Sequence, residues 1–168
     1  LTVLDHPLVG HKMTILRDES TAPAHFRKLV HELAALEAYE ATRDLPTLQV
    51  QVKTPICETE GVRLKDDTLA VVPILRAGMG MLEGVLSVVP SAAVGVLGME
   101  RDEETHEPHS YYAKMPQGIE NRMALVIDPM LATGGSALAA IKYLREAGVK
   151  DIRLLVMVAA PEGVAAVN

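Results

Sequence analysis

One short stretch of this 168-residue chain combines an acidic residue, hydroxyl side chains and paired glycines: Asp128-Pro129-Met130-Leu131-Ala132-Thr133-Gly134-Gly135-Ser136. It follows the apolar segment Met123 to Ile127, which predicts a buried strand, and it leads into a helical pattern that begins near Gly135. Small residues at a helix N-terminus turn tightly and present backbone N–H groups where the helix dipole is positive, an arrangement that binds phosphate. A carboxylate would repel the phosphate itself, so we expect Asp128 to contact hydroxyl groups or a metal ion on the same ligand.

Two other interpretations of this stretch can be weighed from its residues. A nucleoside-triphosphate P-loop requires Gly-Lys followed by Ser or Thr, and no lysine follows Gly135, so that interpretation fails. An ordinary strand-to-helix connection rich in small residues would account for the glycines, but less well for an acid, a turn and a phosphate cup in this order.

A second loop of the same kind follows the continuously apolar segment Leu69 to Leu75, which predicts a strand buried on both faces. This loop is Arg76-Ala77-Gly78-Met79-Gly80, and a helix comes after it. Its glycines approach the spacing of a dinucleotide-binding fingerprint, but the third, Gly84, lies one residue too late. The guanidinium of Arg76 beside a tight Ala-Gly turn suits a diphosphate better, because its planar fork can bond two oxygens at once.

The apolar strands near residues 69, 92, 123 and 152 alternate with helical segments. This order predicts an α/β fold with a mostly parallel sheet and helices on both faces. The loops after Leu75 and Ile127 then lie at carboxyl ends of strands, where open α/β sheets bind their ligands, and we expect them to meet in one crevice.

We assign no chemistry to the remaining segments, which we expect to position these loops. We expect an arm with little periodicity over His6 to Leu16 and a helix from Pro23 to about Arg43, with Ser20 or Thr21 as a cap candidate and Glu37 off its apolar stripe. A half-exposed strand over Leu48 to Thr54, a hairpin or loop over one sheet edge from Glu58 to Asp67, one strand over Ile152 to Ala159 and a short helix from Ala160 should follow.

The segment from Arg101 to Gln117 is polar and long for a connection inside a compact domain. Solvated charge would explain it, and so would a lid that closes over bound substrates and excludes water. His106 and His109 have the spacing of a loose metal pair, but no third ligand is evident, which favours exposed loop histidines.

Bulk properties limit the class of protein. A length of 168 residues fits one domain, and a net charge of -6 with a pI near 5.5 disfavours a nucleic-acid partner. The single cysteine, Cys57, cannot form an internal disulfide, and no segment reaches the roughly 18 apolar residues of a membrane span. We therefore expect a cytoplasmic protein without a membrane partner.

The Asp128 to Ser136 stretch resembles the 5-phosphoribosyl 1-diphosphate (PRPP) loop of phosphoribosyltransferases, in the form found in the uracil phosphoribosyltransferase family. The resemblance implies the phosphoribosyltransferase fold, with transfer of ribose 5-phosphate from PRPP to uracil to give UMP and diphosphate. It also implies PRPP contacts by Arg76, Ala77, Gly78 and Arg101 and by the whole loop: Asp128, Pro129, Met130, Leu131, Ala132, Thr133, Gly134, Gly135 and Ser136. Asp128 and Arg101 are the implied catalytic residues.

Further properties are implied by the resemblance alone. Mg2+ would arrive with the diphosphate rather than through direct protein ligands, the chain would form a homodimer, and GTP could act as an activator. The family's uracil-binding Gly-Leu-Gly-Asp-Ala segment would lie beyond Asn168, so we expect a domain over residues 1–168 that is truncated at its C-terminus, with no uracil contact assigned. A PRPP-sensing regulatory or binding protein on the same fold, and an interaction protein with vestigial loops, are the alternatives.

Overall fold

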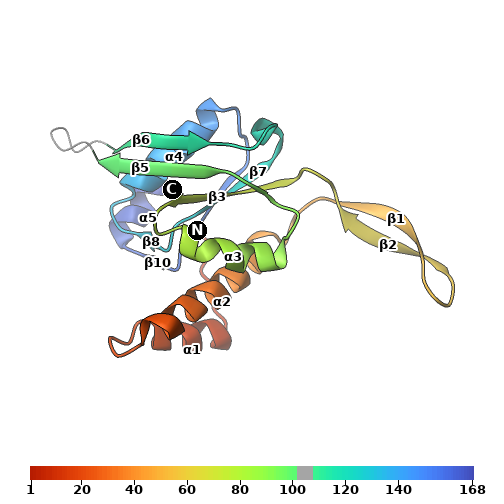
Figure 1. Cartoon of the computed structure of the whole chain (residues 1–168), viewed down its shortest axis with the longest axis horizontal. Helices are drawn as coiled ribbons and strands as arrows, with labels where there is room; N and C mark the ends of the chain where they lie inside the picture. The colour runs from red at the N-terminus through yellow and green to blue at the C-terminus, as the bar shows by residue number, and fades with distance from the viewer. Residues whose placement is uncertain (102–107) are drawn as a thin grey trace.

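The computed structural model describes the backbone of residues 1–101 and 108–168, and the side chains of residues 1–99 and 111–168. Its central sheet has the strand order β6-β5-β3-β7-β9 (Figure 1). The strands are β3 (Leu69–Leu75), β5 (Val96–Arg101), β6 (Pro108–Lys114), β7 (Met123–Ile127) and β9 (Ile152–Leu155), and the short β4 (Ala93–Val94) also pairs with β3. All of these pairings are parallel except that of β6 with β5. The predicted mostly parallel sheet is confirmed.

Helices cover both faces of this sheet, as predicted (Figure 1). The helices α2 (Pro23–Ala41) and α3 (Met79–Val88) share one apolar cluster with alternate residues of β3 and β7, whereas α4 (Gly135–Glu146) shares the other. Leu69 and Val71 belong to the first cluster, and Ala70 and Val72 to the second. Successive side chains of a strand point to opposite faces, so a continuously apolar strand is buried from both sides.

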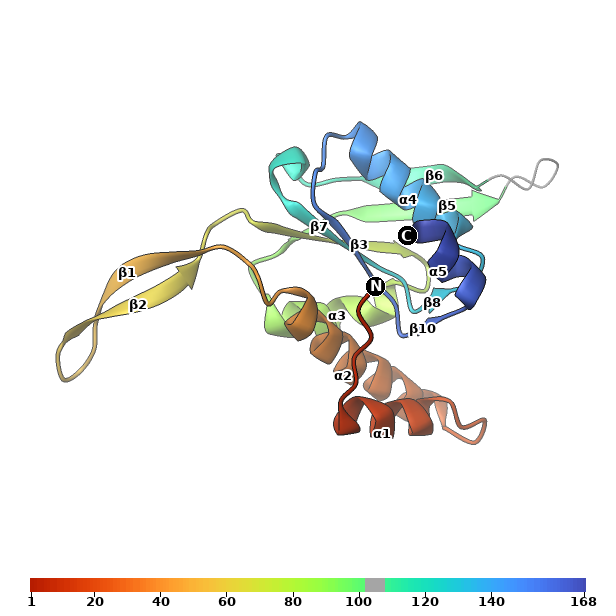
Figure 2. The same ribbon diagram turned by 180° about the vertical axis from the view of Figure 1, so that it is seen from behind.

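Two segments that precede the central sheet, residues 7–16 and 47–64, differ from the structure predicted for them. The segment predicted as an irregular arm is a helix, α1 (Pro7–Leu16), with proline at its start, so that prediction was wrong. It packs against α2 on the side away from the sheet (Figure 2) and has no buried residue. A helix that buries no face needs no amphipathic stripe, which is why periodicity did not reveal it.

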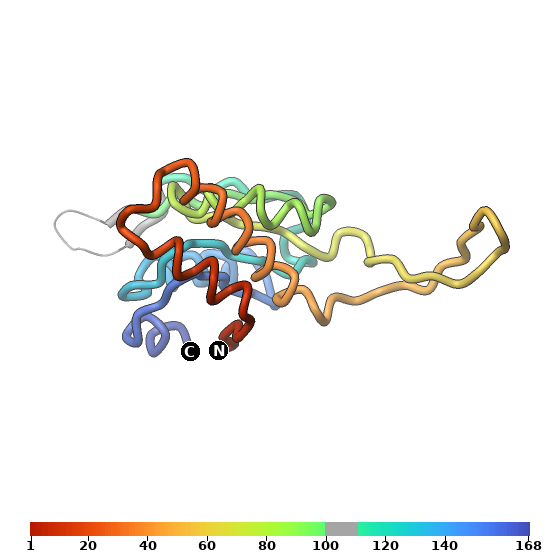
Figure 3. The backbone as a smooth tube through the Cα atoms, turned by 90° about the horizontal axis from the view of Figure 1, so that it is seen from below, coloured from red at the N-terminus to blue at the C-terminus, as the bar shows by residue number. Residues whose placement is uncertain are grey.

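The strands β1 (Thr47–Lys53) and β2 (Glu58–Leu64) form an antiparallel hairpin of their own. The hairpin projects from the body of the molecule and covers no edge of the central sheet (Figure 3). The strand over Leu48 to Thr54 was predicted. The prediction of a hairpin or loop over one sheet edge from Glu58 to Asp67 was wrong, because β2 runs straight through Gly61 and pairs with β1.

Two further predictions of strand and loop need correction. The apolar run over residues 152–159 is two strands in different sheets, because β9 ends at Leu155 and β10 (Val158–Ala159) pairs with β8 (Met130–Leu131). The polar segment from Arg101 to Gln117 is not all loop, since β6 lies within it.

The short 3-10 helix η1 (Ile119–Asn121) precedes β7, and α5 (Pro161–Val167) ends the chain. No helix in the described parts of the chain is long and apolar enough to cross a membrane.

Candidate active site

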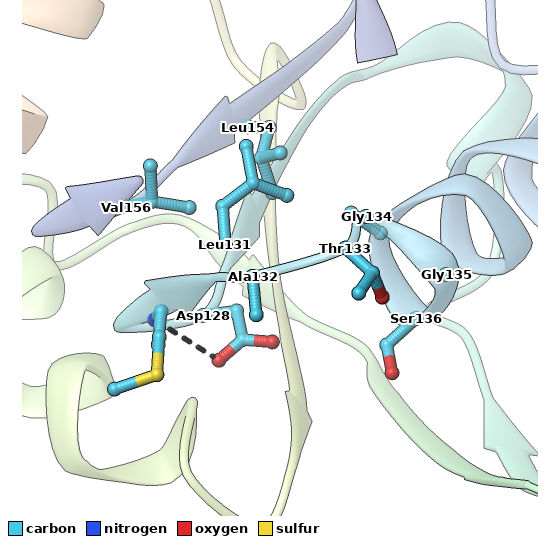
Figure 4. Close-up of a pocket in the computed structure, with 11 residues that line it drawn as sticks. Asp128, Leu131, Ala132, Thr133, Gly134, Gly135, Ser136, Leu154 and Val156 are labelled. Carbon is cyan, nitrogen blue, oxygen red and sulfur yellow. Dashed lines mark hydrogen bonds between the residues drawn. The ribbon is translucent and has the colours of Figure 1, made fainter. Parts of the chain in front are cut away.

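A small pocket of about 90 Å³ lies at the carboxyl end of β7, where Asp128 follows the strand. It is lined by Asp128, Met130, Leu131, Ala132, Thr133, Gly134, Gly135, Ser136, Ala137, Leu154 and Val156. Figure 4 shows the Asp128 carboxylate and the hydroxyls of Thr133 and Ser136 on one side of the loop. The pocket therefore has room for a group the size of a phosphate.

The backbone of the loop turns into α4 at Gly134, which has a φ of +87° and caps the helix. L-residues with side chains rarely adopt this conformation, so glycine is required here. The first N–H groups of α4 have no partner within the helix and lie beside the pocket, where the helix dipole adds positive potential. The helix starts at Gly135, as predicted.

Asp128 is half-buried at the mouth of this pocket. Its Oδ1 accepts a long hydrogen bond of 3.5 Å from the Met130 N–H, which Figure 4 also shows, while its own N–H donates to the Leu155 carbonyl at 3.2 Å. Burial raises the pKa of the Asp128 carboxyl, and the Met130 N–H offsets this only in part. A desolvated carboxylate with few partners is well suited to accept hydrogen bonds from ligand hydroxyl groups.

The second predicted loop lies directly beside the first. Gly78 is buried, and a Cβ at this position would lie 2.4 Å from the carbonyl oxygen of Ile127, the residue before Asp128. The Gly78 N–H also donates to the Ile74 carbonyl at 2.9 Å, which closes the turn. Only a residue without a side chain permits this approach, so the end of β3 and the end of β7 meet at Gly78.

The structure brings together most, but not all, of the predicted site residues. Arg76 and Ala77 are exposed at the mouth of the second loop and do not line the pocket, and Pro129 does not line it either. Arg101 ends β5, whose parallel partner is β3, so its backbone lies toward the same edge of the sheet as the two loops. Its side chain lies outside the described residues, as do those of His106 and His109 and residues 102–107 of the lid predicted over Arg101 to Gln117.

Three pocket residues were not predicted, namely Ala137 in α4, Leu154 and Val156. Leu154 and Val156 come from β9 and the turn after it, which the sequence indicated only as an apolar strand. The pairing of β9 with β7 could have indicated these two residues, because the carboxyl ends of neighbouring parallel strands lie at the same edge of the sheet. Within residues 1–99 and 111–168, no three His, Cys, Asp or Glu side chains are grouped so as to hold a metal ion.

Solved structures place this fold in a known class. A purine phosphoribosyltransferase from Pyrococcus horikoshii superposes with a TM-score of 0.57 at 11% identity, covering 82% of this chain and 74% of that one. The AQ2163 protein from Aquifex aeolicus superposes with a TM-score of 0.91 at 37% identity, covering 99% of this chain and 79% of that one. The fold is therefore that of the phosphoribosyltransferases, as predicted.

Sequence comparison narrows the class to one family. The family model described as uracil phosphoribosyltransferase matches residues 3–168. A uracil phosphoribosyltransferase of Lactobacillus gasseri is 55% identical over 99% of this chain and 80% of its own length, and one of Clostridium novyi is 52% identical over the same shares. This chain belongs to the uracil phosphoribosyltransferase family, which confirms the family predicted from the Asp128 to Ser136 stretch.

Proposed function

We propose that this chain transfers ribose 5-phosphate from PRPP to uracil, giving UMP and diphosphate in pyrimidine salvage. Family membership supports the reaction. The structural observation that carries the proposal is the contact of Gly78 with the Ile127 carbonyl, because it joins a candidate diphosphate loop to a candidate 5-phosphate loop. PRPP carries both groups on one ribose, and no observation on the described residues favours a PRPP-sensing protein instead.

The loop residues take roles that follow from their position around the pocket. The 5-phosphate is held by the segment from Ala132 to Ser136, through backbone N–H groups and two hydroxyls. Asp128 accepts hydrogen bonds from the ribose hydroxyls, and Arg76 binds the diphosphate together with Arg101 and the turn at Gly78. Together they fix the ribose between its two charged groups.

The reaction breaks the bond between the anomeric carbon and the diphosphate, while the uracil nitrogen forms a bond to the same carbon and loses its proton to the departing diphosphate or to water. Positive charge develops on the ribose and negative charge on the departing diphosphate, so stabilisation requires donors near the leaving group and a fixed orientation. Arg76 and Arg101 supply such donors in this scheme. The carboxylate of Asp128 lies on the ribose side, where it orients the sugar and is placed to stabilise its positive charge.

Mg2+ fits this site as an ion bound mainly by the substrate. The pocket offers N–H groups, hydroxyls and one carboxylate, Asp128, rather than a cage of acidic ligands. Magnesium retains waters and is commonly held by substrate phosphates with one or two carboxylates. When bound, it would neutralise charge on the diphosphate.

The test is calorimetric titration of PRPP in the presence of Mg2+, with UMP formation from uracil measured in the same samples. We expect Asp128→Asn and Ser136→Ala to weaken PRPP binding by about tenfold or more, since hydrogen bonds to charged groups contribute about 1.5–3 kcal/mol. Asp66→Asn and Ser87→Ala are matched controls away from the pocket and should keep the affinity of the unsubstituted chain. Unchanged affinity in both site variants would refute the assignment.

We also propose that the chain forms a homodimer through its projecting hairpin. The pairing register places Leu48, Val50 and Val52 on one face, and Leu48 remains 51% exposed, while Ile56 at the tip is 94% exposed. A two-stranded hairpin is marginal alone in water, so a partner surface that covers this apolar face would stabilise it.

Sedimentation can test the dimer. Leu48→Glu would place a charge in the proposed interface and raise the dimer dissociation constant by at least about tenfold, which corresponds to about 1.4 kcal/mol. Gln49→Glu adds the same charge on the opposite face of the hairpin and should leave the dimer intact. A monomeric unsubstituted chain would overturn the proposal.

Two finer properties remain proposals with simpler tests. Activation by GTP is tested by adding GTP to the UMP assay, where an increased rate at limiting PRPP is expected. A cytoplasmic location agrees with the free and exposed Cys57, and fractionation of cells would test it.

A further inference from the structure

The C-terminal segment after β9 packs against the back of the loop that lines the pocket. The N–H groups of Met157 and Val158 both donate to the Pro129 carbonyl at 3.2 Å, and the Ala160 N–H donates to the Leu131 carbonyl at 2.8 Å. These bonds continue the parallel pairing of β10 with β8. Alternate carbonyls of the loop are therefore held toward β10 and α5.

In addition to these bonds, the backbone of α5 packs directly against the loop at Gly163, with no side chain between them. A Cβ on Gly163 would lie 2.3 Å from the Ala132 carbonyl oxygen and 2.9 Å from the Leu131 Cγ. Gly134 meets the same helix, since a Cβ there would lie 3.1 Å from the Ala166 Cβ. The turn of the loop is thus fitted closely to the backbone of α5.

Peptide geometry converts this packing into an orientation of donors. The C=O of one residue and the N–H of the next lie in one planar unit and point in opposite directions. Holding the Leu131 carbonyl toward Ala160 therefore turns the Ala132 N–H away from β10. Ala132 also lines the pocket, whose Asp128 carboxylate and Ser136 hydroxyl are shown in Figure 4.

We propose that β10 and α5 form a backstop that orients the Ala132 N–H toward the 5-phosphate, with Ala160 and Gly163 as positioning residues. Neither residue contacts substrate. The inference rests on the proposed function, because it takes the loop as the 5-phosphate site. It adds that affinity for this phosphate depends on a helix behind the pocket.

Two substitutions disturb the backstop in different ways. Ala160→Pro removes the N–H that bonds Leu131 and places the proline Cδ against the same carbonyl, while the backbone of Ala160, with φ -82° and ψ 149°, is close to what proline adopts. Gly163→Ala pushes on the Ala132 carbonyl. The matched controls are Ala22→Pro, at a helix start with φ -62° and ψ 146° that also precedes a proline, and Gly10→Ala, where a Cβ meets nothing within 4 Å.

The readout is the affinity of each variant for PRPP, for ribose 5-phosphate and for inorganic diphosphate with Mg2+, with thermal unfolding measured in parallel. We expect Ala160→Pro and Gly163→Ala to weaken PRPP and ribose 5-phosphate binding by about tenfold to a hundredfold, as misplacement of a binding group by up to about 1 Å does. Diphosphate affinity should stay unchanged, because the diphosphate binds at Arg76 to Gly78. Both controls should bind all three ligands as the unsubstituted chain does.

The possible results separate this inference from the proposed function. Unchanged ribose 5-phosphate affinity in folded Ala160→Pro overturns the backstop even if Gly163→Ala fails to fold. An equal loss of diphosphate binding also overturns it, since that result shows general loosening. If Ser136→Ala also leaves ribose 5-phosphate binding intact, or the unsubstituted chain binds no PRPP, the proposed phosphate site itself fails.

Discussion

Glu37 lies on α2 between the buried residues Ala34 and Ala38 and turns toward the interior. Its Oε2 is buried and has no hydrogen-bond partner among the described residues. Burial raises the pKa of this carboxyl from 4.5 to about 7. Ionised Glu37 should therefore destabilise the folded chain, and replacement by neutral glutamine should remove that cost.

The pKa values fix both the sign and the size of the effect. Between pH 4.5 and about 7 the folded chain keeps a proton on Glu37 that the unfolded chain has lost, so the free energy of unfolding falls as pH rises through this window. A shift of this size corresponds to an upper bound of about 3 kcal/mol, since one pKa unit is worth 1.36 kcal/mol. Below pH 4.5 the effect vanishes because both states are protonated.

Urea denaturation gives the free energy of unfolding of the unsubstituted chain and of Glu37→Gln at pH 4.5 and at pH 8. The effect is the change, between the two pH values, in the difference between the two chains. The stability gained by the substitution should grow by about 2–3 kcal/mol from the lower to the higher pH. Glu40→Gln on the same helix is the control, because hydrogen bonding to Arg43 lowers the pKa of Glu40. A gain for Glu37→Gln that does not change with pH would refute the reasoning.

Three other predictions follow from the described contacts. Gly78→Ala should lower the free energy of unfolding by about 1–3 kcal/mol through overpacking against the Ile127 carbonyl and should weaken diphosphate binding, as denaturation and calorimetry would show. Arg153→Ala removes a guanidinium that donates to the Ala41 carbonyl at 2.7 Å near the end of α2, so urea denaturation should show a loss of about 1 kcal/mol. Because burial raises the pKa of Asp128, PRPP affinity should fall as pH is lowered, and Asp128→Asn should lose that dependence in calorimetry.

The sheet could be predicted because its strands carry a direct physical signal. The segments that became β3 and β7 are continuously apolar, and only a strand covered on both faces buries every residue. Glu37 shows the limit of such signals. The helical stripe of α2 indicated that Glu37 lay off the apolar face, but contacts from other parts of the chain decide burial, and these have no trace in local spacing.

The sequence predicted the loops of the candidate site but not the contacts that support them, and the buried glycines explain why. Gly78, Gly84 and Gly163 are all buried, and each admits a backbone carbonyl from a distant segment, namely those of Ile127, His31 and Ala132. In a sequence a glycine indicates a turn or a break, so Gly78 and Gly84 looked like an imperfect nucleotide fingerprint. Their shared role is contact between backbones, which fixes α3 on α2 and the two loops on each other. A site held by such contacts has supporting residues with no side chain to recognise, so substitution of these glycines by alanine is the way to find them.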